Sequence, residues 1–416
     1  MKTKILKIIA NLNFSIILLL IISLVSIVGT VIEQDQNIEF YKLNYPLTNQ
    51  LFGFLSWNII LKLELDHIYK TWWFISLIFI FGVSLSTCSV LQQLPAFRIA
   101  RRCQFLRTIF QFQQLKIYRS LKQSNISKLV FKLKTNNYSI FQQKNLIYCY
   151  QGLVGRIAPI LVHFSMITVL VGTVIGSLLG FNGQESIPKT ETFHIQNIFS
   201  SGKLTKFPIL SSRINDFWIL YKDQNTIDQF YSNISILNLN GEETIYKTGC
   251  VNSPVKYNSL DFYQTNWNLI GLRFQTQNLQ VQYPLTTLNK VWLTWLPLLP
   301  KFNDGFTVLI NNLQGYCSIY SKTGKFLGNL ELNETFPSRL SYTLIDIISS
   351  DGLQIKIDPG IKIIYFGFFW LMITSIISYK SYSQIWLLKN NSKIFIGGNT
   401  TRALFQFEFE FFKLIK

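Results

Sequence analysis

The chain has 416 residues, of which 49% are hydrophobic and 14% charged, and its mean hydropathy is +0.25. These values exclude an ordinary soluble protein, and 39 Lys and Arg residues exclude a chain that lies wholly in a membrane. The net charge of +18 suggests nucleic-acid binding, but the basic residues flank apolar segments, so we expect a mixed membrane protein that binds no nucleic acid.

Four apolar stretches are each long enough to cross a hydrocarbon core of about 30 Å. They cover residues 14–32, 72–91, 157–180 and 361–379, and the first two give an N-terminal membrane region over residues 1–91. The first stretch follows three lysines, as a signal peptide would. It is longer than the usual apolar core of a signal peptide and lacks a small-residue cleavage site before Glu33, so we expect a retained anchor.

Lys and Arg residues are distributed unequally between the segments that connect these spans. The loop 92–156 carries twelve Lys or Arg and no Asp or Glu, whereas residues 181–360 carry fourteen of each. The positive-inside rule therefore places the loop 92–156 and the tail 380–416 on the cytoplasmic or stromal side, where they can contact anionic lipid. The domain 181–360 then faces a periplasm or a thylakoid lumen.

Within the loop, residues 95–116 mix Arg with Phe, Ile and Leu, which suits a helix lying in the membrane interface. Residues 128–152 are expected to form two or three short strands or extended turns. A solvated basic linker is the alternative for the whole loop.

The domain 181–360 shows alternating apolar and polar residues between turn sequences, which predicts antiparallel strands. Residues 290–300 interrupt the alternation with two Trp and two Pro, and they form either buried core or an aromatic anchor. The expected fold is therefore four transmembrane helices plus a large all-β extramembrane domain, sandwich or barrel-like.

The five cysteines form no CxxC pair and no CxxCH sequence, which excludes a thioredoxin-like dithiol and covalent attachment of haem to this chain. Cys250 and Cys317 both lie in the outer domain. Whether the two cysteines form a disulfide stays undecided, because the sequence does not give the distance between them.

The chain has three histidines, and one of them, His163, lies within the third predicted span. An ionisable residue in a membrane helix is a functional candidate; a neutral imidazole there either hydrogen-bonds a neighbouring helix or ligates haem iron. No second histidine lies in a span, so the opposite haem ligand would come from another subunit. His67 and His194, close to span ends on the outer side, are weaker candidates.

No P-loop, GxSxG, HExxH or intramembrane carboxylate pair is found, so we assign no catalytic residue.

The block YSIFQQKNLIYCYQGLVGRIAPILVHFSMITVLVGTVIG, residues 138–176, contains His163. It resembles the segment around the third span of the ResB/CcsB family of System II cytochrome c biogenesis. Three further blocks occur in the family's order and extend the resemblance along the chain: GTVIEQDQ at 29–36, INDFWILY at 214–221 and DGLQIKIDPG at 351–360.

The resemblance implies a membrane assembly factor that acts with a CcsA-type partner. The pair would carry haem b across the membrane and present it with an apocytochrome c, including cytochrome f in a plastid, for thioether attachment. The family partner's tryptophan-rich motif is absent here, so the chain resembles the non-catalytic subunit of a haem lyase, and Trp72 and Trp73 are interpreted as interfacial anchors. The alternative is a haem-free scaffold or apocytochrome chaperone that stabilises the partner. The bias to Phe and Lys over Ala and Arg is typical of an AT-rich genome, such as that of a plastid or of some bacteria. We expect a plastid thylakoid membrane, or the inner or thylakoid membrane of a bacterium.

Overall fold

The computed structural model describes residues 2–415 except 49, 51–54, 123–125, 223–225, 239, 277–278, 289–290, 299–300, 311–312, 314, 337–340 and 391–392. The chain divides into two compact units. The membrane unit comprises Met1–Gln34, Tyr41–Gly176 and Gly360–Lys416, and the β unit comprises Asp35–Phe40 and Ser177–Pro359.

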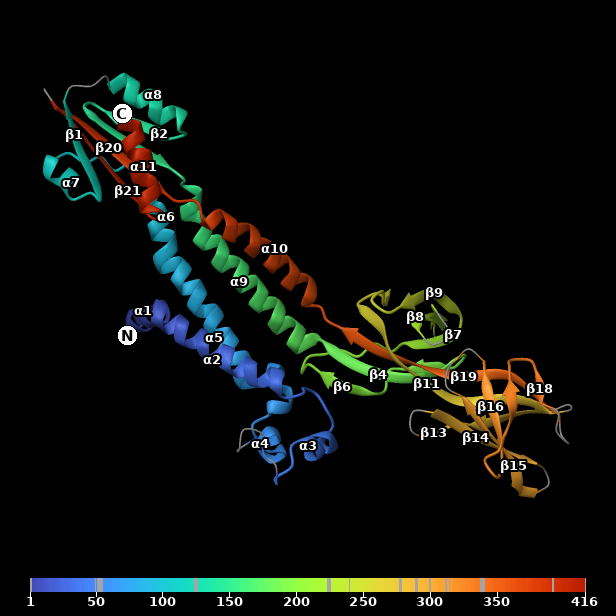
Figure 1. Cartoon of the computed structure of the whole chain (residues 1–416). Coiled ribbons are helices and arrows are strands. Elements are labelled where there is room, and N and C mark those ends of the chain that lie inside the picture. The colour runs from blue at the N-terminus through green and yellow to red at the C-terminus, as the bar shows by residue number, and fades with distance from the viewer. Residues whose placement is uncertain are drawn as a thin grey trace. The chain divides into compact units, whose positions relative to one another are not determined.

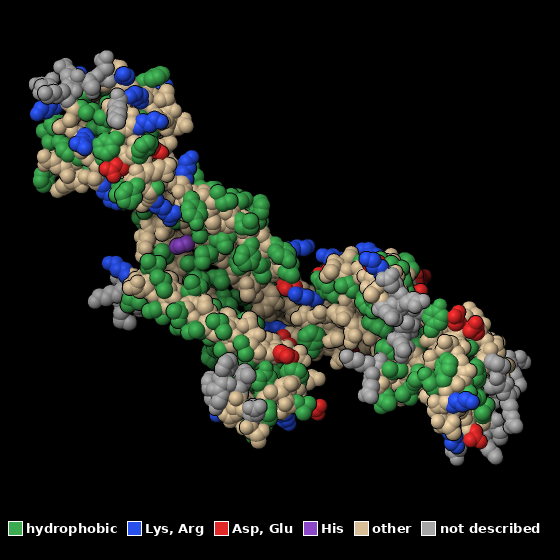
Figure 2. Space-filling view, in the orientation of Figure 1, with side chains coloured by type: hydrophobic (Ala, Val, Ile, Leu, Met, Phe, Trp, Pro, Cys, Tyr) green, Lys and Arg blue, Asp and Glu red, His purple; other side chains and the backbone are tan. Residues whose placement is uncertain are grey.

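Four helices among the described residues are long and apolar enough to cross a bilayer, which confirms the four predicted spans. They are α2 (Leu12–Val31), α5 (Trp72–Cys88), α9 (Val154–Leu179) and α10 (Ile361–Ser378). The second continues through a π-helical turn, η2 (Ser89–Gln93), into α6 (Leu94–Ala100). Pro95 is the second residue of α6 and directly follows the π-helical turn, and the helix continues through it to Ala100. Hydrophobic side chains dominate the helical surface on the face shown in Figure 2.

Two glycine contacts bring α9 and α10 close together, and the helices lie side by side in Figure 1. A Cβ on Gly172 would meet Ile364 Cγ1 at 2.8 Å, and a Cβ on Gly367 would meet Val169 Cγ2 at 2.7 Å. Such small residues let the backbones of membrane helices approach each other. α2 and α5 pack against α9 through a separate core around Leu18, Phe81 and Leu85.

Shorter helices lie at the ends of these spans: α1 (Lys2–Ile9), α3 (Ile38–Asn44), α4 (Trp57–Lys62) and the 3₁₀ helix η1 (Leu65–Lys70).

The loop 92–156 and the tail 380–416 combine into one α/β domain, which we call the basic domain (residues 101–152 and 380–415). Its elements are α7 (Ile109–Gln113), β1 (Ile117–Lys122), α8 (Ile126–Thr135), β2 (Ser139–Gln143), β3 (Leu146–Gln151), β20 (Ser383–Asn390), β21 (Lys393–Thr400) and α11 (Leu404–Ile415). The antiparallel sheet has the order β1-β21-β20-β3-β2, so tail strands lie at its centre, with Trp386 opposite Tyr148. The alternative interpretation of this loop as a solvated linker is therefore wrong.

The expectation of short strands in residues 128–152 holds for β2 and β3. Two other details of the loop differ from the expectation. The start of residues 128–152 is helical, because Leu129 and Leu133, four residues apart, pack together in the hydrophobic core of the basic domain. Residues 95–116 do not form one interfacial helix: α6 ends at Ala100, and Phe105 and Leu106 pack against the cluster that contains Tyr148.

The β unit contains antiparallel sheets, none of them closed, which confirms the predicted all-β domain. Its strands are β4 (Phe181–Pro188), β5 (Thr192–His194), β6 (Ile198–Ser201), β7 (Ser211–Tyr221), β8 (Ile227–Leu237), β9 (Glu243–Cys250), β10 (Val255–Tyr257), β11 (Leu260–Thr276), β12 (Leu279–Pro284), β13 (Thr286–Leu288), β14 (Val291–Leu298), β15 (Lys301–Ile310), β16 (Cys317–Ser321), β17 (Phe326–Leu330), β18 (Thr335–Phe336) and β19 (Tyr342–Ile357). The sheet orders are β10-β11-β19-β4-β6, β13-β14-β15-β16-β17 and β5-β7-β8-β9, with β12 pairing β11 and β18 pairing β19.

The paired long strands β11 and β19 contribute to two separate hydrophobic cores of the β unit. Leu344 and Ile347 of β19 belong to one core, and Leu353 and Ile355 belong to the other. β14 carries most of the tryptophan- and proline-rich segment, and its Leu296 is buried in the first core, which favours the core interpretation. Residues 290, 299 and 300 of that segment lie outside the described residues.

The two cysteines of the β unit, Cys250 and Cys317, are free. Cys250 ends β9, whereas Cys317 begins β16 of another sheet and is 1% exposed. Burial raises the pKa of the Cys317 thiol to about 12, which makes this thiol unreactive.

A buried carboxylate lies between the two cores. Asp351 is fully buried on β19, two residues after the buried Ser349. Burial raises the pKa of Asp351 to about 6, although the side chains of Ser232 and Gln264 oppose the shift. The folded state therefore binds a proton at Asp351 more tightly than the unfolded chain does.

We expect the β unit to be more stable in acid than at neutral pH. Since the folded pKa lies above the usual value of 3.8, the free energy of unfolding should fall as the pH rises from about 4 to about 6. The loss should be about 3 kcal/mol. Asp351→Asn should remove this dependence and raise stability at pH 7.5, measured by denaturation of the full chain followed by tryptophan fluorescence. Asp261→Asn, on β11, is the control; an unchanged pH dependence in Asp351→Asn contradicts the expectation.

Candidate functional site

The intramembrane histidine is held by a serine of the neighbouring helix. His163 lies on α9, and its Nδ1 is 2.9 Å from Ser89 Oγ. The same hydroxyl donates to the carbonyl of Leu85 at 2.8 Å, so its single hydrogen is already used. We therefore assign the imidazole hydrogen to Nδ1, which donates to Ser89. In the neutral ring, Nε2 then carries a lone pair, and no described residue hydrogen-bonds to it.

Ser89 lies where the helix changes its winding. Its amide still bonds to the carbonyl of Leu85, as in a regular α-helix, so α5 itself sets the position of the hydroxyl. The π-helical turn η2 starts with Ser89, and such turns occur frequently at functional sites.

The glycines of the GLVGR sequence fix where α9 begins. A Cβ on Gly152, whose φ is +76°, would lie 2.0 Å from the carbonyl oxygen of Ser381. A Cβ on Gly155 would lie 1.9 Å from the carbonyl oxygen of Lys380. Only glycine permits these approaches, so the start of α9 lies directly against the segment that follows α10.

Arg156 completes this junction. Its guanidinium lies 5.5 Å from the ring centre of Tyr382, whose hydroxyl donates to the carbonyl of Ala100 at 2.9 Å. The beginning of α9 and the end of α6 are therefore joined through Tyr382. His163 follows Arg156 by seven residues, about 10 Å along the helix.

An apolar groove lies between α5 and α9 next to the His163–Ser89 pair. Its volume is about 370 Å³, and it is lined by Ile78, Phe79, Gly82, Val83, Ser86, Ile167, Leu170, Val171, Val174 and Ile175. Ser86 precedes Ser89 by three residues and Ile167 follows His163 by four, so one end of the groove lies one helical turn from the pair. A Cβ on Gly82 would touch only Leu170, at 3.9 Å, so this glycine leaves the groove open.

The other two histidines do not join this site. His67 belongs to η1, before α5, whereas Ser89 follows the start of α5 by 17 residues, or about 25 Å of helix. His67 Nδ1 instead pairs with Asp66 at 2.9 Å. His194 lies on β5 of the β unit, where its Nδ1 is 3.2 Å from the carbonyl of Leu210.

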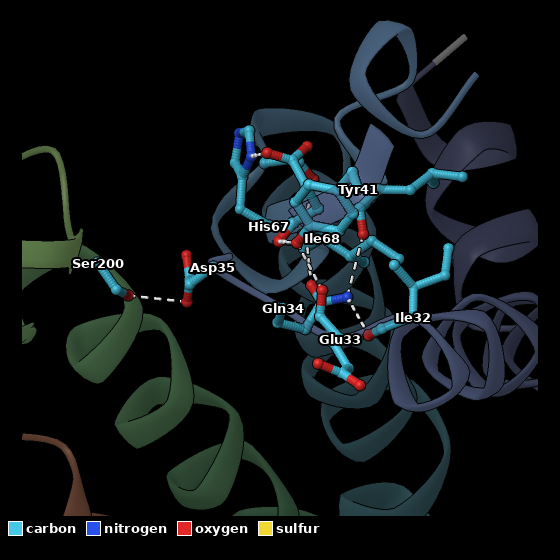
Figure 3. A network of polar contacts seen from close by, with 11 residues as sticks. Ile32, Glu33, Gln34, Asp35, Tyr41, His67, Ile68 and Ser200 are labelled. Atoms are coloured by element: carbon cyan, nitrogen blue, oxygen red, sulfur yellow. Dashed lines mark hydrogen bonds and ion pairs between the residues drawn. The ribbon is translucent and has the colours of Figure 1, made fainter. Parts of the chain in front are cut away.

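A glutamine positions the turn that carries His67 (Figure 3). Gln34 Nε2 donates to the carbonyls of Ile32 and Leu65 at 2.9 and 3.0 Å, and Gln34 Oε1 accepts from the amide of Ile68 at 3.0 Å. Ile68 is fully buried. The GTVIEQ sequence therefore connects the end of α2 to the turn before α5.

Gly29 of the same sequence lies against this turn, because a Cβ there would meet Tyr69 Oη at 2.9 Å. Within the β unit, Asp35 accepts a hydrogen bond from Ser200 at 2.8 Å (Figure 3).

The sequence predicted His163 but not Ser89, Gly82 or Gln34. A possible signal for Ser89 was the recurrence of small polar residues within an apolar span, at Ser84, Ser86 and Ser89. Because such serines also bond to their own helix, as Ser86 does to the carbonyl of Gly82, the pattern alone does not identify the one that contacts a histidine.

Comparison with known proteins places the chain among membrane proteins of one family. The model of the ResB-like family matches residues 12–316. A relative from Thalassiosira pseudonana, named cytochrome c biogenesis protein Ccs1, is 62% identical over 421 residues and covers 100% of both chains. The protein of the same name from Phaeodactylum tricornutum is 58% identical over 420 residues, also covering 100% of both chains. Cytochrome c biogenesis protein CcsB of Trichormus variabilis is 40% identical over 427 residues, 100% of this chain and 93% of the relative.

We expect Gln34→Ala to destabilise the membrane unit. The substitution would leave the buried amide of Ile68 and the carbonyl of Leu65 without their partner, at a cost of about 2–3 kcal/mol. Thermal denaturation of the purified chain should show a lowered midpoint. Glu33→Ala, at the exposed neighbouring side chain, is the control, and equal midpoints for the two variants would refute the role of Gln34.

Proposed function

We propose that this chain, which belongs to the ResB-like family, is a membrane factor in the biogenesis of c-type cytochromes. The proposal is supported by relatives with that name that align over the whole chain. It is also supported by the positions of the GTVIEQ and GLVGR sequences, which lie at the junctions that hold the membrane helices.

We place the protein in a thylakoid membrane. The relatives come from algae and from a cyanobacterium, and the Phe- and Lys-rich composition suits a plastid chain. The basic domain would face the stroma, because its segments carry most of the unbalanced positive charge, and the β unit would face the lumen.

The observation that carries the proposal is the free Nε2 of His163 beside an apolar groove. Haem, as cargo, needs a neutral imidazole nitrogen for its iron and an apolar space for its ring. His163 would supply the nitrogen, and the groove that includes Gly82 and Leu170 would hold the edge of the ring. An imidazole nitrogen and an apolar groove one helical turn away are the features that haem b would need, and they support the proposal.

Ser89 would keep the imidazole in the tautomer that presents Nε2. Histidine ligands almost always donate their second ring N–H to a neighbouring group, which fixes the ring and raises its basicity. Bound haem supplies vinyl groups that cysteine thiols of an apocytochrome attack to form thioethers. This chain's residues hold and orient the cargo; the membrane around them excludes water.

A second axial histidine for the haem iron would come from a partner, since His163 is the one histidine within the predicted spans. A CcsA-type membrane protein would supply that ligand and the attachment step. The β unit would hold the apocytochrome, including cytochrome f, by pairing at an open sheet edge. A haem-free scaffold is the alternative, and the His163–Ser89 hydrogen bond also suits simple helix packing.

Haem content of purified complexes separates these two functions. His163→Ala should lower the haem bound per complex, while partner binding stays intact, because the iron loses its ligand. Added imidazole should restore part of the haem, since it can occupy the vacated position. Phe164→Ala, at the adjacent exposed side chain, is the control. Wild-type haem content in His163→Ala would favour the scaffold and lead to tests of His67 and His194 as outer ligands.

Ser89→Ala should weaken haem binding by about tenfold, as expected when a partner of a histidine ligand is removed. Ser89→Thr retains the hydroxyl and should restore binding. A pure packing role predicts instead that Ser89→Ala lowers the amount of complex and leaves the haem per complex unchanged, because the imidazole loses its hydrogen-bond partner.

Two native cysteines can show on which side of the membrane the basic domain and the β unit lie. Cys103 of the basic domain is exposed and Cys250 of the β unit is half-buried, whereas the other three are buried. A membrane-impermeant maleimide should label Cys103 only from the stromal face of thylakoid vesicles and Cys250 only from the lumenal face. Cys103→Ser and Cys250→Ser identify each labelled band, and the reversed pattern would overturn the orientation.

A further inference from the structure

A second cavity lies in the basic domain, away from His163. Its volume is about 580 Å³, within the range of small-molecule sites. The cavity lies between α8 and the sheet, and its floor includes Ile147, Leu387 and Ile394. These side chains are at most 6% exposed and belong to the domain core, so the base of the cavity is preformed. The accessible apolar surface of the lining comes from α8, where Phe131 is 69% exposed.

Three lysines surround this apolar floor. Lys134 comes from α8, Lys144 from the turn between β2 and β3, and Lys389 from β20. No acidic side chain lines the cavity, and no ion pair involves these lysines among the described residues. The cavity therefore matches an apolar molecule that carries anionic groups.

The neighbouring cavity of the same domain provides a contrast. It measures about 710 Å³ and contains Lys132 and Lys413 together with the carboxylate of Glu410. Its charges are partly balanced within the protein. Glu408 and Glu410, both on α11, are the only acids in residues 92–156 and 380–416, so the lysine-lined cavity has no comparable counter-charge.

The lysine-lined cavity opens at the end of the sheet that is remote from the membrane helices. β3 leads from Leu146 toward α9, and β20 leads from α10 toward Asn390. Lys389 therefore follows Ser383 by six residues, about 20 Å along the strand. Lipids of the bilayer do not extend that far, so a ligand would arrive from the aqueous compartment.

We propose that this cavity receives a tetrapyrrole dicarboxylate, the chemical class of haem, from the aqueous side. The flat apolar ring would lie above the base of the cavity and pack against Phe131 of α8, and the two carboxylates would contact the lysines. The lining residues include no histidine, cysteine or methionine, so binding depends on the ring and its carboxylates and not on iron. The inference rests on the proposed function, because haem is the cargo proposed there.

Carboxylate coupling tests the proposal on the full chain in phosphatidylcholine nanodiscs. Metal-free protoporphyrin is added with a water-soluble carbodiimide, which joins a propionate to a nearby lysine amine as an amide and takes up the lost water as a urea. Peptide mass spectrometry should find the label on Lys134, Lys144 or Lys389. In the double variant Lys134→Glu/Lys389→Glu the amine of Lys144 remains, and its labelling should fall about tenfold because the carboxylates lose two cationic partners. The second-cavity variant Lys132→Glu/Lys413→Glu should label Lys144 as wild type does.

Competition and a haem spectrum complete the test. Protoporphyrin dimethyl ester, which lacks free carboxylates, should not compete, and palmitate should compete weakly. Equal competition by palmitate, or labelling spread evenly over surface lysines, would overturn the tetrapyrrole assignment. Labelling should be unchanged in His163→Gly. Absent labelling with a normal His163-dependent haem spectrum overturns the cavity alone, whereas specific labelling without that spectrum overturns the proposed haem ligand and leaves the cavity standing.

Discussion

Close backbone contact between the start of α9 and the segment after α10 is the constraint on which the membrane unit depends. Gly152 and Gly155 lie against the carbonyls of Ser381 and Lys380, where any side chain would collide. The contact joins a loop and a tail that are more than 200 residues apart in the chain, and it allows β20 to pair with β3. It also fixes the helix that carries His163. A displacement at this junction would move the imidazole relative to Ser89, although neither residue touches the junction.

The bilayer adds a second constraint, because polar groups in hydrocarbon must find partners within the protein. The membrane helices meet it with small hydroxyl side chains: Ser15 Oγ lies 2.7 Å from Ser84 Oγ, and Ser84 also donates to the carbonyl of Ile9. The Ser89 hydroxyl donates to the carbonyl of Leu85 on its own helix and accepts from Nδ1 of His163. Such bonds contribute about 1 kcal/mol each, so their main effect is to select one rotation of each helix.

The sequence predicted the features that depend on local pattern. The four spans follow from hydropathy alone, and the strands of the β unit follow from alternation. The pairing of loop and tail was not predictable, since no local signal records a partner more than 200 residues away. α8 was missed because LVFKL contains both a strand-like alternation and a helical spacing, and only the sheet beneath it selects the helix. For the same reason His163 was found and Ser89 was not: an imidazole in an apolar span is conspicuous by itself, whereas a serine gains its role from a neighbour 74 residues away.

Because His163 is the one histidine within the predicted spans, it also affects how tightly a cargo would be held. Stable haem proteins with two histidine ligands retain their cofactor, whereas a carrier must release it. In the proposed function this chain offers one imidazole, and the opposite ligand belongs to a partner, so occupancy would depend on both subunits. The groove between α5 and α9 is apolar and carries no charged lining residue that could hold a carboxylate. Binding there would rest on one coordinate bond and on ring burial, and removal of the partner's ligand would be enough to let the cargo leave.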